Sequence, residues 1–261
     1  MVRFGYRAWH VTGRFGLHEL VLVVAAFLVY YLIRAAVVSR AGDALLNAYD
    51  IIALQQAMGI YWELEMQSWI LDSHLAIRLV NWMYFWGHMP LIIVFAAWLY
   101  FWRRPTYVLM RNAFLASGAI GVVIYWLYPL APPRLVPFEG FVDTMALFDE
   151  LSYQAQETEA FVNPFAAMPS LHFGWAMLLG GAVAWVGRHW YLAVAGIAWP
   201  ILMFFAIVLS GNHFILDAVA GAVVGLLGLV VALGIERAKP RAVAWLRRRI
   251  PALEGAAVEQ R

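Results

Sequence analysis

The sequence predicts an all-α integral membrane protein with six transmembrane helices. Of its 261 residues, 64% are apolar or aromatic and only 13% are charged, whereas roughly a quarter of an ordinary soluble domain is charged. Six continuous apolar runs occur at about 17–38, 79–102, 106–130, 170–187, 190–209 and 213–235. Each is near the roughly 20 residues that cross a bilayer as a helix. Because the runs do not alternate with polar residues, helices are favoured over membrane strands.

The first run, 17–38, follows Arg3, Arg7 and Arg14, as the apolar core of a secretory signal would. It is longer than such a core, and no convincing small-residue cleavage site accompanies it. We therefore interpret it as a retained membrane anchor.

The distribution of charge predicts which helix ends face the cytoplasm. Fourteen of the 18 cations lie in the N-terminal segment, the 103–111 turn, Arg188 and the tail from Glu236, whereas 11 of the 16 acidic residues lie in the loops 39–78 and 131–169. Cytoplasmic loops of membrane proteins are enriched in Lys and Arg. Both termini are therefore predicted to be cytoplasmic and both long loops to lie outside, with the plasma membrane as the expected location.

The predicted spans divide the chain into a cytoplasmic N-terminus, a six-helix membrane domain and a basic cytoplasmic tail, at residues 1–16, 17–235 and 236–261. The tail carries clustered arginines, which the anionic lipids of the inner leaflet would attract. Nucleic acid is not an expected partner.

Two further patterns concern packing. Segment 43–70 of the first outer loop has apolar residues at helical spacing with carboxylates interspersed, which predicts a helix lying along the outer interface. Gly221 and Gly225 form a small-xxx-small pair, which is more typical of helix packing within one chain than of an oligomer seam. An oligomer is therefore compatible with the sequence but not implied.

A first polar cluster precedes the fourth predicted helix and runs from Asn163 to His172. Ser170 is predicted to cap the start of that helix and His172 to lie in its opening turn. The free N–H groups of a helix start favour an anion. An Asp inside a membrane helix costs about 2.5–3.5 kcal/mol on insertion scales, so polar groups at such positions indicate a function.

A second polar cluster precedes the sixth predicted helix, where Asn212 and His213 are followed by Asp217. The i and i+4 positions of His213 and Asp217 place them on one helix face. The topology predicted from the arginines brings this cluster and His172 to the same outer level. Arg134, the single cation of loop 131–169, also lies on that side.

An arginine, two helix starts, a His–Asp pair and a second histidine predict a site for phosphate chemistry. Asp217 is predicted to hold one ring nitrogen of His213, which leaves the other as the nucleophile, and His172 is predicted to protonate the departing oxygen. The phosphoryl group would then pass from His213 to an incoming alcohol or water. Ser170 and Asn212 are predicted to contact the phosphate, and Asn163 and His88 are further candidates.

These residues resemble the type 2 phosphatidic acid phosphatase and vanadium haloperoxidase superfamily, over about residues 79 to 235. Pro-Ser170-Leu-His172 is similar to its second motif and His213-Phe-Ile-Leu-Asp217 to its third. Pro-Pro-Arg134 is similar to the first motif as it occurs in the branch of inositol phosphorylceramide and sphingomyelin synthases. The resemblance implies an enzyme that acts on a membrane lipid, without a cofactor.

The sequence departs from the phosphatase form of these motifs at four positions. Leu127 and Leu135 replace a lysine and a proline of the first motif, Leu171 replaces a glycine of the second, and Ile207 replaces an arginine of the third. As a result, the chain has fewer motif residues to bind the phosphate than the phosphatase form has. This pattern resembles the synthase branch, in which a phospho-headgroup moves from one lipid to another alcohol.

The prediction is therefore a metal-independent phosphotransferase that acts at the outer face, and a lipid phosphate phosphatase is the alternative. Two histidines and a carboxylate are also a metal triad, but Arg134 would repel a cation. The chain contains no cysteine, which excludes thiolate ligands and thiol nucleophiles. A non-enzymatic lipid transporter is a remoter alternative, since the polar residues cluster at the outer ends of the helices instead of following their full length.

Overall fold

A computed structural model describes residues 39–148, 164–187 and 189–249, together with residues 16–17, 19–22, 24–26 and 28. The described residues form helices joined by loops and contain one isolated parallel β-bridge, between Leu130 and Ala166, but no extended strand. The prediction of an all-α integral membrane protein is confirmed. Most of the first predicted span, 17–38, lies outside the described residues, and so does Asn163.

Among the described residues, three helices are long and apolar enough to cross a membrane. They are α6 (Arg104–Leu127), α10 (Trp190–Leu209) and the segment Ile215–Lys239 of α11 (Ile215–Arg249). The pair α4 (His74–Trp86) and α5 (Met89–Trp102) forms a fourth candidate span if its two helices are counted as one. Helix α9 (Leu171–Val186) is apolar but has only 16 residues. The number of six spans stays a prediction.

The span predicted at 79–102 is not one straight helix, because α4 and α5 meet at a bend of 43°. Gly87 ends α4, and Pro90 lies in the first turn of α5. Proline has no N–H to donate to a preceding turn, so it fits best in the first turn of a helix. His88 therefore lies in the break between two helices instead of within one.

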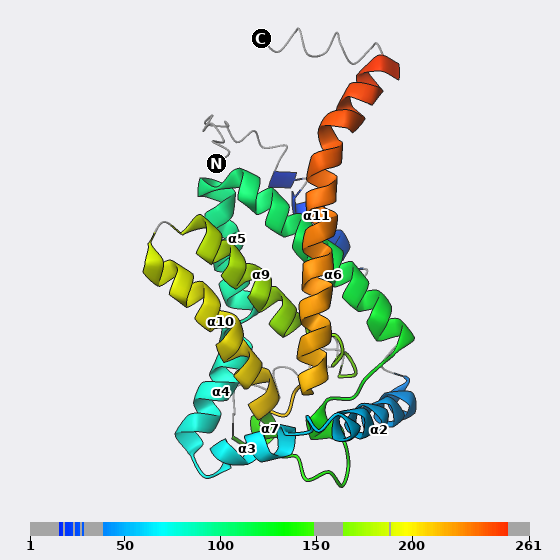
Figure 1. Cartoon of the computed structure of the whole chain (residues 1–261), viewed down its shortest axis with the longest axis vertical. Helices are drawn as coiled ribbons and strands as arrows, with labels where there is room; N and C mark the ends of the chain where they lie inside the picture. The colour runs from blue at the N-terminus through cyan, green and yellow to red at the C-terminus, as the bar shows by residue number, and fades with distance from the viewer. Residues whose placement is uncertain are drawn as a thin grey trace.

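The segment predicted as one interfacial helix at 43–70 forms two helices, α2 (Ala41–Ala57) and α3 (Glu63–Leu71). They are separated at Gly59, whose φ of +70° is a conformation that favours glycine. Figure 1 shows α2, α3 and the short helix α7 (Thr144–Phe148) together at one end of the bundle, opposite the α5–α6 junction. These helices form a layer over the helix ends that carry the site.

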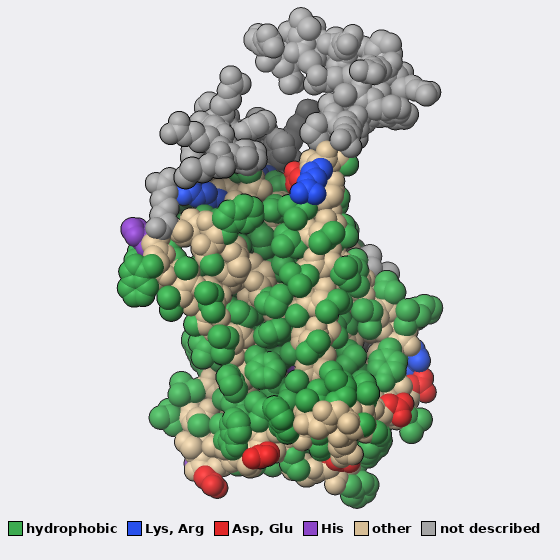
Figure 2. All heavy atoms as spheres, viewed as in Figure 1, with side chains coloured by type: hydrophobic (Ala, Val, Ile, Leu, Met, Phe, Trp, Pro, Cys, Tyr) green, Lys and Arg blue, Asp and Glu red, His purple; other side chains and the backbone are tan. Residues whose placement is uncertain are grey.

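The two ends of the molecule differ in charge. Figure 2 shows Asp and Glu side chains at the end where α2 and α3 lie, and Lys and Arg side chains mainly at the other end. At that second end Glu19 contacts Arg111 at 2.5 Å and Arg104 at 3.4 Å, and the side chain of Asn112 donates to Glu236 at 3.1 Å. The basic tail predicted from 236 continues α11 as far as Arg249.

Glycines bring α9 against α11. A Cβ added to Gly174 would overlap the backbone of Gly221, one added to Gly221 would overlap the carbonyl oxygen of Ser170, and one added to Gly225 would lie 3.0 Å from the carbonyl oxygen of Gly174. Small residues allow such a backbone approach between membrane helices. The prediction that Gly221 and Gly225 mark packing within the chain is confirmed.

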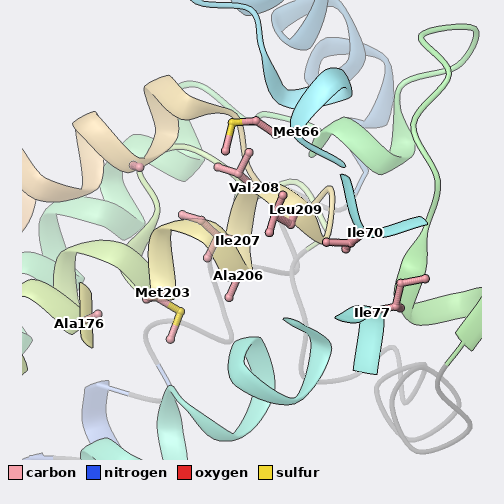
Figure 3. Packing of buried hydrophobic residues seen from close by; sticks show 10 residues of the cluster. Met66, Ile70, Ile77, Ala176, Met203, Ala206, Ile207, Val208 and Leu209 are labelled. Carbon is pink, nitrogen blue, oxygen red and sulfur yellow. The ribbon is translucent and has the colours of Figure 1, made fainter. Parts of the chain in front are cut away.

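An apolar cluster fixes α3 to the bundle. Figure 3 shows Met66 and Ile70 of α3 beside the segment of α10 from Met203 to Leu209. Met203 and Ile207 are fully buried there. The cluster therefore anchors α3 next to the loop that follows α10.

Gly221→Ala should force α9 and α11 apart, because its new methyl group would overlap the backbone of Ser170. We expect a loss of about 1–3 kcal/mol of stability and a larger fractional loss of activity, measured as the thermal midpoint and turnover in detergent. Gly234→Ala is the matched control, since a Cβ at Gly234 meets nothing within 4 Å. Equal midpoints for the two variants would contradict the packing described.

Candidate active site

His213 lies in the loop between α10 and α11, and this loop folds back onto α10. Gly211 has a φ of +71°, and the backbone amides of Asn212 and His213 donate to the carbonyl of Ile207 at 3.1 and 3.0 Å. The sequence needs a glycine at this turn because a side chain there would be strained. The turn brings His213 back onto the end of α10, where its side chain is buried.

Two acceptors face Nδ1 of His213. The carbonyl oxygen of Ala167 is 2.9 Å away and Oδ2 of Asp217 is 3.3 Å away. A carbonyl oxygen only accepts hydrogen bonds, so this network assigns the proton to Nδ1 and leaves Nε2 as the unprotonated nitrogen. The predicted contact between His213 and Asp217 is present, and Ala167 is a second partner that the sequence did not reveal.

Asp217 links the start of α9, which carries His172, to the loop that carries His213. Its Oδ2 accepts from the amide of Phe214 at 2.9 Å, and its backbone carbonyl accepts from the amide of Ser170 at 2.9 Å. The side chain is fully buried, and its Oδ1 has no hydrogen-bond partner among the described residues. The position of Asp217 is thus fixed relative to α9 as well as to His213.

His172 lies in the first turn of α9, as predicted. Ser170 caps this helix by accepting from the amide of Phe173 at 3.4 Å, and the hydroxyl of Tyr125 holds the preceding turn by donating to the carbonyl of Pro169 at 2.8 Å. The ring centroids of His172 and His213 are 5.7 Å apart. The two predicted motifs therefore meet in space.

Aromatic rings from the bent helix pair pack against His172. The centroid of Tyr84 lies 4.5 Å and that of His88 lies 4.0 Å from the His172 ring, and His88 also stacks on Trp175 at 5.6 Å. The indole N–H of Trp175 donates to the hydroxyl of Ser117 at 3.0 Å. The bend between α4 and α5 thus places His88 next to His172, so this candidate belongs to the site by contact.

Arg134 is held next to the His213 loop. It lies in the short 3₁₀ helix η1 (Pro133–Leu135), and its amide donates to the carbonyl of Gly211 at 2.9 Å. Its Nε donates to the side-chain oxygen of Asn212 at 2.8 Å, while the amide nitrogen of that side chain donates to the hydroxyl of Ser210 at 2.8 Å. Arg134 and Asn212 are therefore brought together as a unit.

The site offers ligands for an anion. In the described part of the chain, no group of three or more His, Asp or Glu side chains is arranged to hold a metal ion. The anion-binding groups that the geometry does provide are the guanidinium of Arg134 and the amides at the start of α9, where the first residues of a helix have no intrahelical acceptor. This geometry is suited to a phosphate.

Comparisons with known proteins agree with this chemistry. Residues 49–231, well over half of the chain, match the model of the PAP2 superfamily. The chain belongs to the PAP2 superfamily. This PAP2 protein is also 28% identical over 146 residues to phosphoinositol dihydroceramide synthase of Bacteroides thetaiotaomicron, an alignment that covers 48% of the chain and 45% of that relative. No solved structure matches it.

The start of α11 in this PAP2 protein is not an open anion site, which corrects the expectation of two free helix starts. The amide of Ile215 donates to Oε1 of Glu63 at 2.7 Å, and the amide of Leu216 donates to the side-chain oxygen of Gln55 at 3.0 Å. The side chain of Gln55 also donates to Oε1 of Glu63 at 2.7 Å. An internal carboxylate therefore occupies the place where a helix start would hold an anion.

Sequence reasoning missed these capping residues because segment 43–70 was interpreted as an interfacial helix. The available signal was that Gln55, Glu63 and Gln67 stand at helical spacing with buried apolar residues such as Ile51 and Met66. A polar side chain on an apolar helix face requires a partner. Burial raises the pKa of Glu63 above its ordinary value, and the hydrogen bonds from Ile215 and Gln55 oppose that shift.

Glu63→Leu should destabilise the protein, because it leaves the amide of Ile215 and the side chain of Gln55 buried without an acceptor. Each such loss costs about 1–3 kcal/mol. Glu63→Gln keeps an acceptor oxygen and should retain most of the stability and turnover. Thermal midpoints in detergent measure the difference, with Glu65→Leu, an exposed position on the same helix, as control. A Glu63→Leu midpoint equal to that of the control would show that the cap is dispensable.

Proposed function

We propose that this PAP2 protein is a phosphotransferase that acts on a lipid-borne phosphate through a phosphohistidine at His213, without a metal ion. The observation that carries the proposal is the geometry of His213. Its Nδ1 faces Ala167 and Asp217, so Nε2 is available as a nucleophile, and the ring of His172 lies 5.7 Å away, centroid to centroid. A nucleophile oriented by a third group and paired with a second titratable side chain is the pattern of covalent catalysis.

In the first half-reaction Nε2 of His213 attacks the phosphorus, and the bond from phosphorus to the lipid oxygen breaks. Protonated His172 gives its proton to that departing oxygen. Asp217 stabilises the positive charge on the phosphorylated ring of His213. In the second half-reaction neutral His172 takes the proton of an incoming hydroxyl, and the hydroxyl oxygen bonds to the phosphorus as the bond from phosphorus to Nε2 breaks. This step restores the free His213 and the protonated His172.

The proposed phosphate-binding groups are Arg134, Asn212, Ser170 and the first amides of α9. The guanidinium supplies the positive charge, and it is already oriented by its bond to Asn212. The hydroxyl of Ser170 accepts from the helix and retains its own proton to donate. Asn163, outside the described residues, stays a candidate for contact with the headgroup.

We prefer transfer to an alcohol over hydrolysis, with the lipid phosphatase as the second candidate. The preference is supported by the single arginine of the motifs, with leucine at 127 and isoleucine at 207 where the phosphatase form has cations. It is also supported by the relative named as a phosphoinositol dihydroceramide synthase, although the aligned segment spans less than half of that relative. Fewer cations suit a singly charged phosphodiester better than a doubly charged monoester.

The proposed orientation has the site at the outer face of the plasma membrane and both termini in the cytoplasm. The positive-inside rule supports it, because Arg104, Arg111 and Lys239 lie at the end opposite α2 and α3. The substrate then comes from the outer leaflet, and the basic tail contacts anionic lipids of the inner leaflet.

His213→Ala should abolish turnover of every substrate, since no other side chain takes the phosphoryl group. His172→Ala should reduce turnover of a natural lipid ester by at least about a hundredfold and spare an activated aryl ester of the same phospho-headgroup, whose leaving group needs no proton. Rates on both esters, with and without chelator, measure this. Equal losses on the two esters in His172→Ala would assign His172 to phosphate binding instead of proton transfer.

A single cysteine introduced at Ser68, on the exposed face of α3, should react with an impermeant maleimide in intact cells. One introduced at Ala238, near the end of the apolar part of α11, should react only after the membrane is opened. Both positions are exposed in the structure, and the natural chain has no cysteine to interfere. Labelling in the opposite order would invert the proposed orientation.

A further inference from the structure

The phosphate-binding arginine already has an anionic partner. Nη1 of Arg134 lies 3.3 Å from Oδ2 of Asp143, and the two side chains are 9% and 22% exposed. This carboxylate belongs to none of the three motifs, and it follows Arg134 by nine positions in the outer loop. Asp143 thus places a negative charge beside the group proposed to bind the phosphate.

The position of Asp143 is fixed independently of Arg134. Its other oxygen, Oδ1, accepts from the amides of Met145 and Ala146 at 3.2 and 3.0 Å and so caps α7. The next residue, Thr144, is fully buried and exchanges hydrogen bonds with Asn81 of α4 at 3.0 and 3.1 Å. Oδ1 holds the helix, and Oδ2 faces the arginine.

Negative charge therefore exceeds positive charge around the site. Arg134 is the cation that the predicted motifs supply, and it faces the carboxylate of Asp143, while the carboxylate of Asp217 lies beside His213. A phosphomonoester carries a charge of about −1.5 to −2 at pH 7, whereas a phosphodiester carries a single negative charge. A second negative charge on the phosphate meets more repulsion from Asp143 than a single one does.

We propose that Asp143 is a specificity-determining residue that makes the site select phosphodiester lipids over phosphomonoester lipids. This inference rests on the proposed function, because it concerns the charge of the phosphate that His213 attacks. It adds a repulsive element to that site. The small number of cations weakens the attraction for every phosphate, whereas the carboxylate of Asp143 repels a doubly charged phosphate more than a singly charged one.

Two lipids with the same leaving group test the proposal. Dioleoyl phosphatidate is a monoester and dioleoyl phosphatidylinositol is a diester, and attack on either phosphorus releases dioleoylglycerol, which mass spectrometry quantifies. The wild-type protein should have the higher kcat/KM on the diester. In Asp143→Asn the ratio of monoester to diester kcat/KM should rise about tenfold, since one negative charge near the phosphate is removed.

Asparagine and serine also cap helices, so Asp143→Asn and Asp143→Ser should both fold. Inhibition by inorganic phosphate, much of which is the dianion at slightly alkaline pH, should strengthen in both variants. Asp43→Asn is the matched control, because Asp43 pairs with Arg40 at 2.9 Å at the exposed start of α2, and the ratio of this variant should equal that of the wild type.

An unchanged ratio in the Asp143 variants, or an equal loss on both lipids, would overturn the inference and leave the proposed function standing. Absence of dioleoylglycerol from both lipids with the wild-type protein would overturn the proposed function and this inference with it. Release of dioleoylglycerol by the His213→Ala variant would also overturn both the proposed function and this inference.

Discussion

The buried cap on the first turn of α11 is the constraint on which the site depends. Glu63 and Gln55 accept from the amides of Ile215 and Leu216, two and three residues after the proposed nucleophile. The helix start would otherwise attract the substrate phosphate to the wrong place. Because the cap comes from α2 and α3, these two helices help to shape the candidate site and do not merely cover the end of the bundle.

The residues of the candidate site could be proposed from the sequence because their signals are local. Polar residues at the ends of apolar runs, an i and i+4 spacing and a serine at a helix start identify His172, His213 and Asp217 from the sequence alone. Their convergence follows from the direction of the spans, which the arginines indicate. The structure further gives the distance between the two histidine rings and identifies Nδ1 as the His213 nitrogen that faces Ala167 and Asp217.

The remaining features depend on contacts between segments far apart in the sequence. Glu63 lies 152 positions from Ile215, and Asn81 lies 63 positions from Thr144. Neither pairing follows from periodicity, which describes one helix at a time. The bend that brings His88 to His172 was signalled by Gly87 and Pro90, but its direction is set by the packing of neighbouring helices. The number of spans stays a prediction for a related reason, since length alone does not decide whether a 16-residue helix such as α9 crosses a bilayer.

The shortness of α9 has a consequence for where the reaction takes place. Its 16 residues extend about 24 Å, against about 30 Å for the 20 residues of its neighbour α10. The two helices pack side by side, with Gly180 against Gly196, so the start of α9 with His172 lies below the end of α10. The loop after α10 folds back onto Ile207, which brings His213 next to His172. The proposed phosphate site would thus lie deeper along the bundle than the end of α10, a position that limits the access of bulk water.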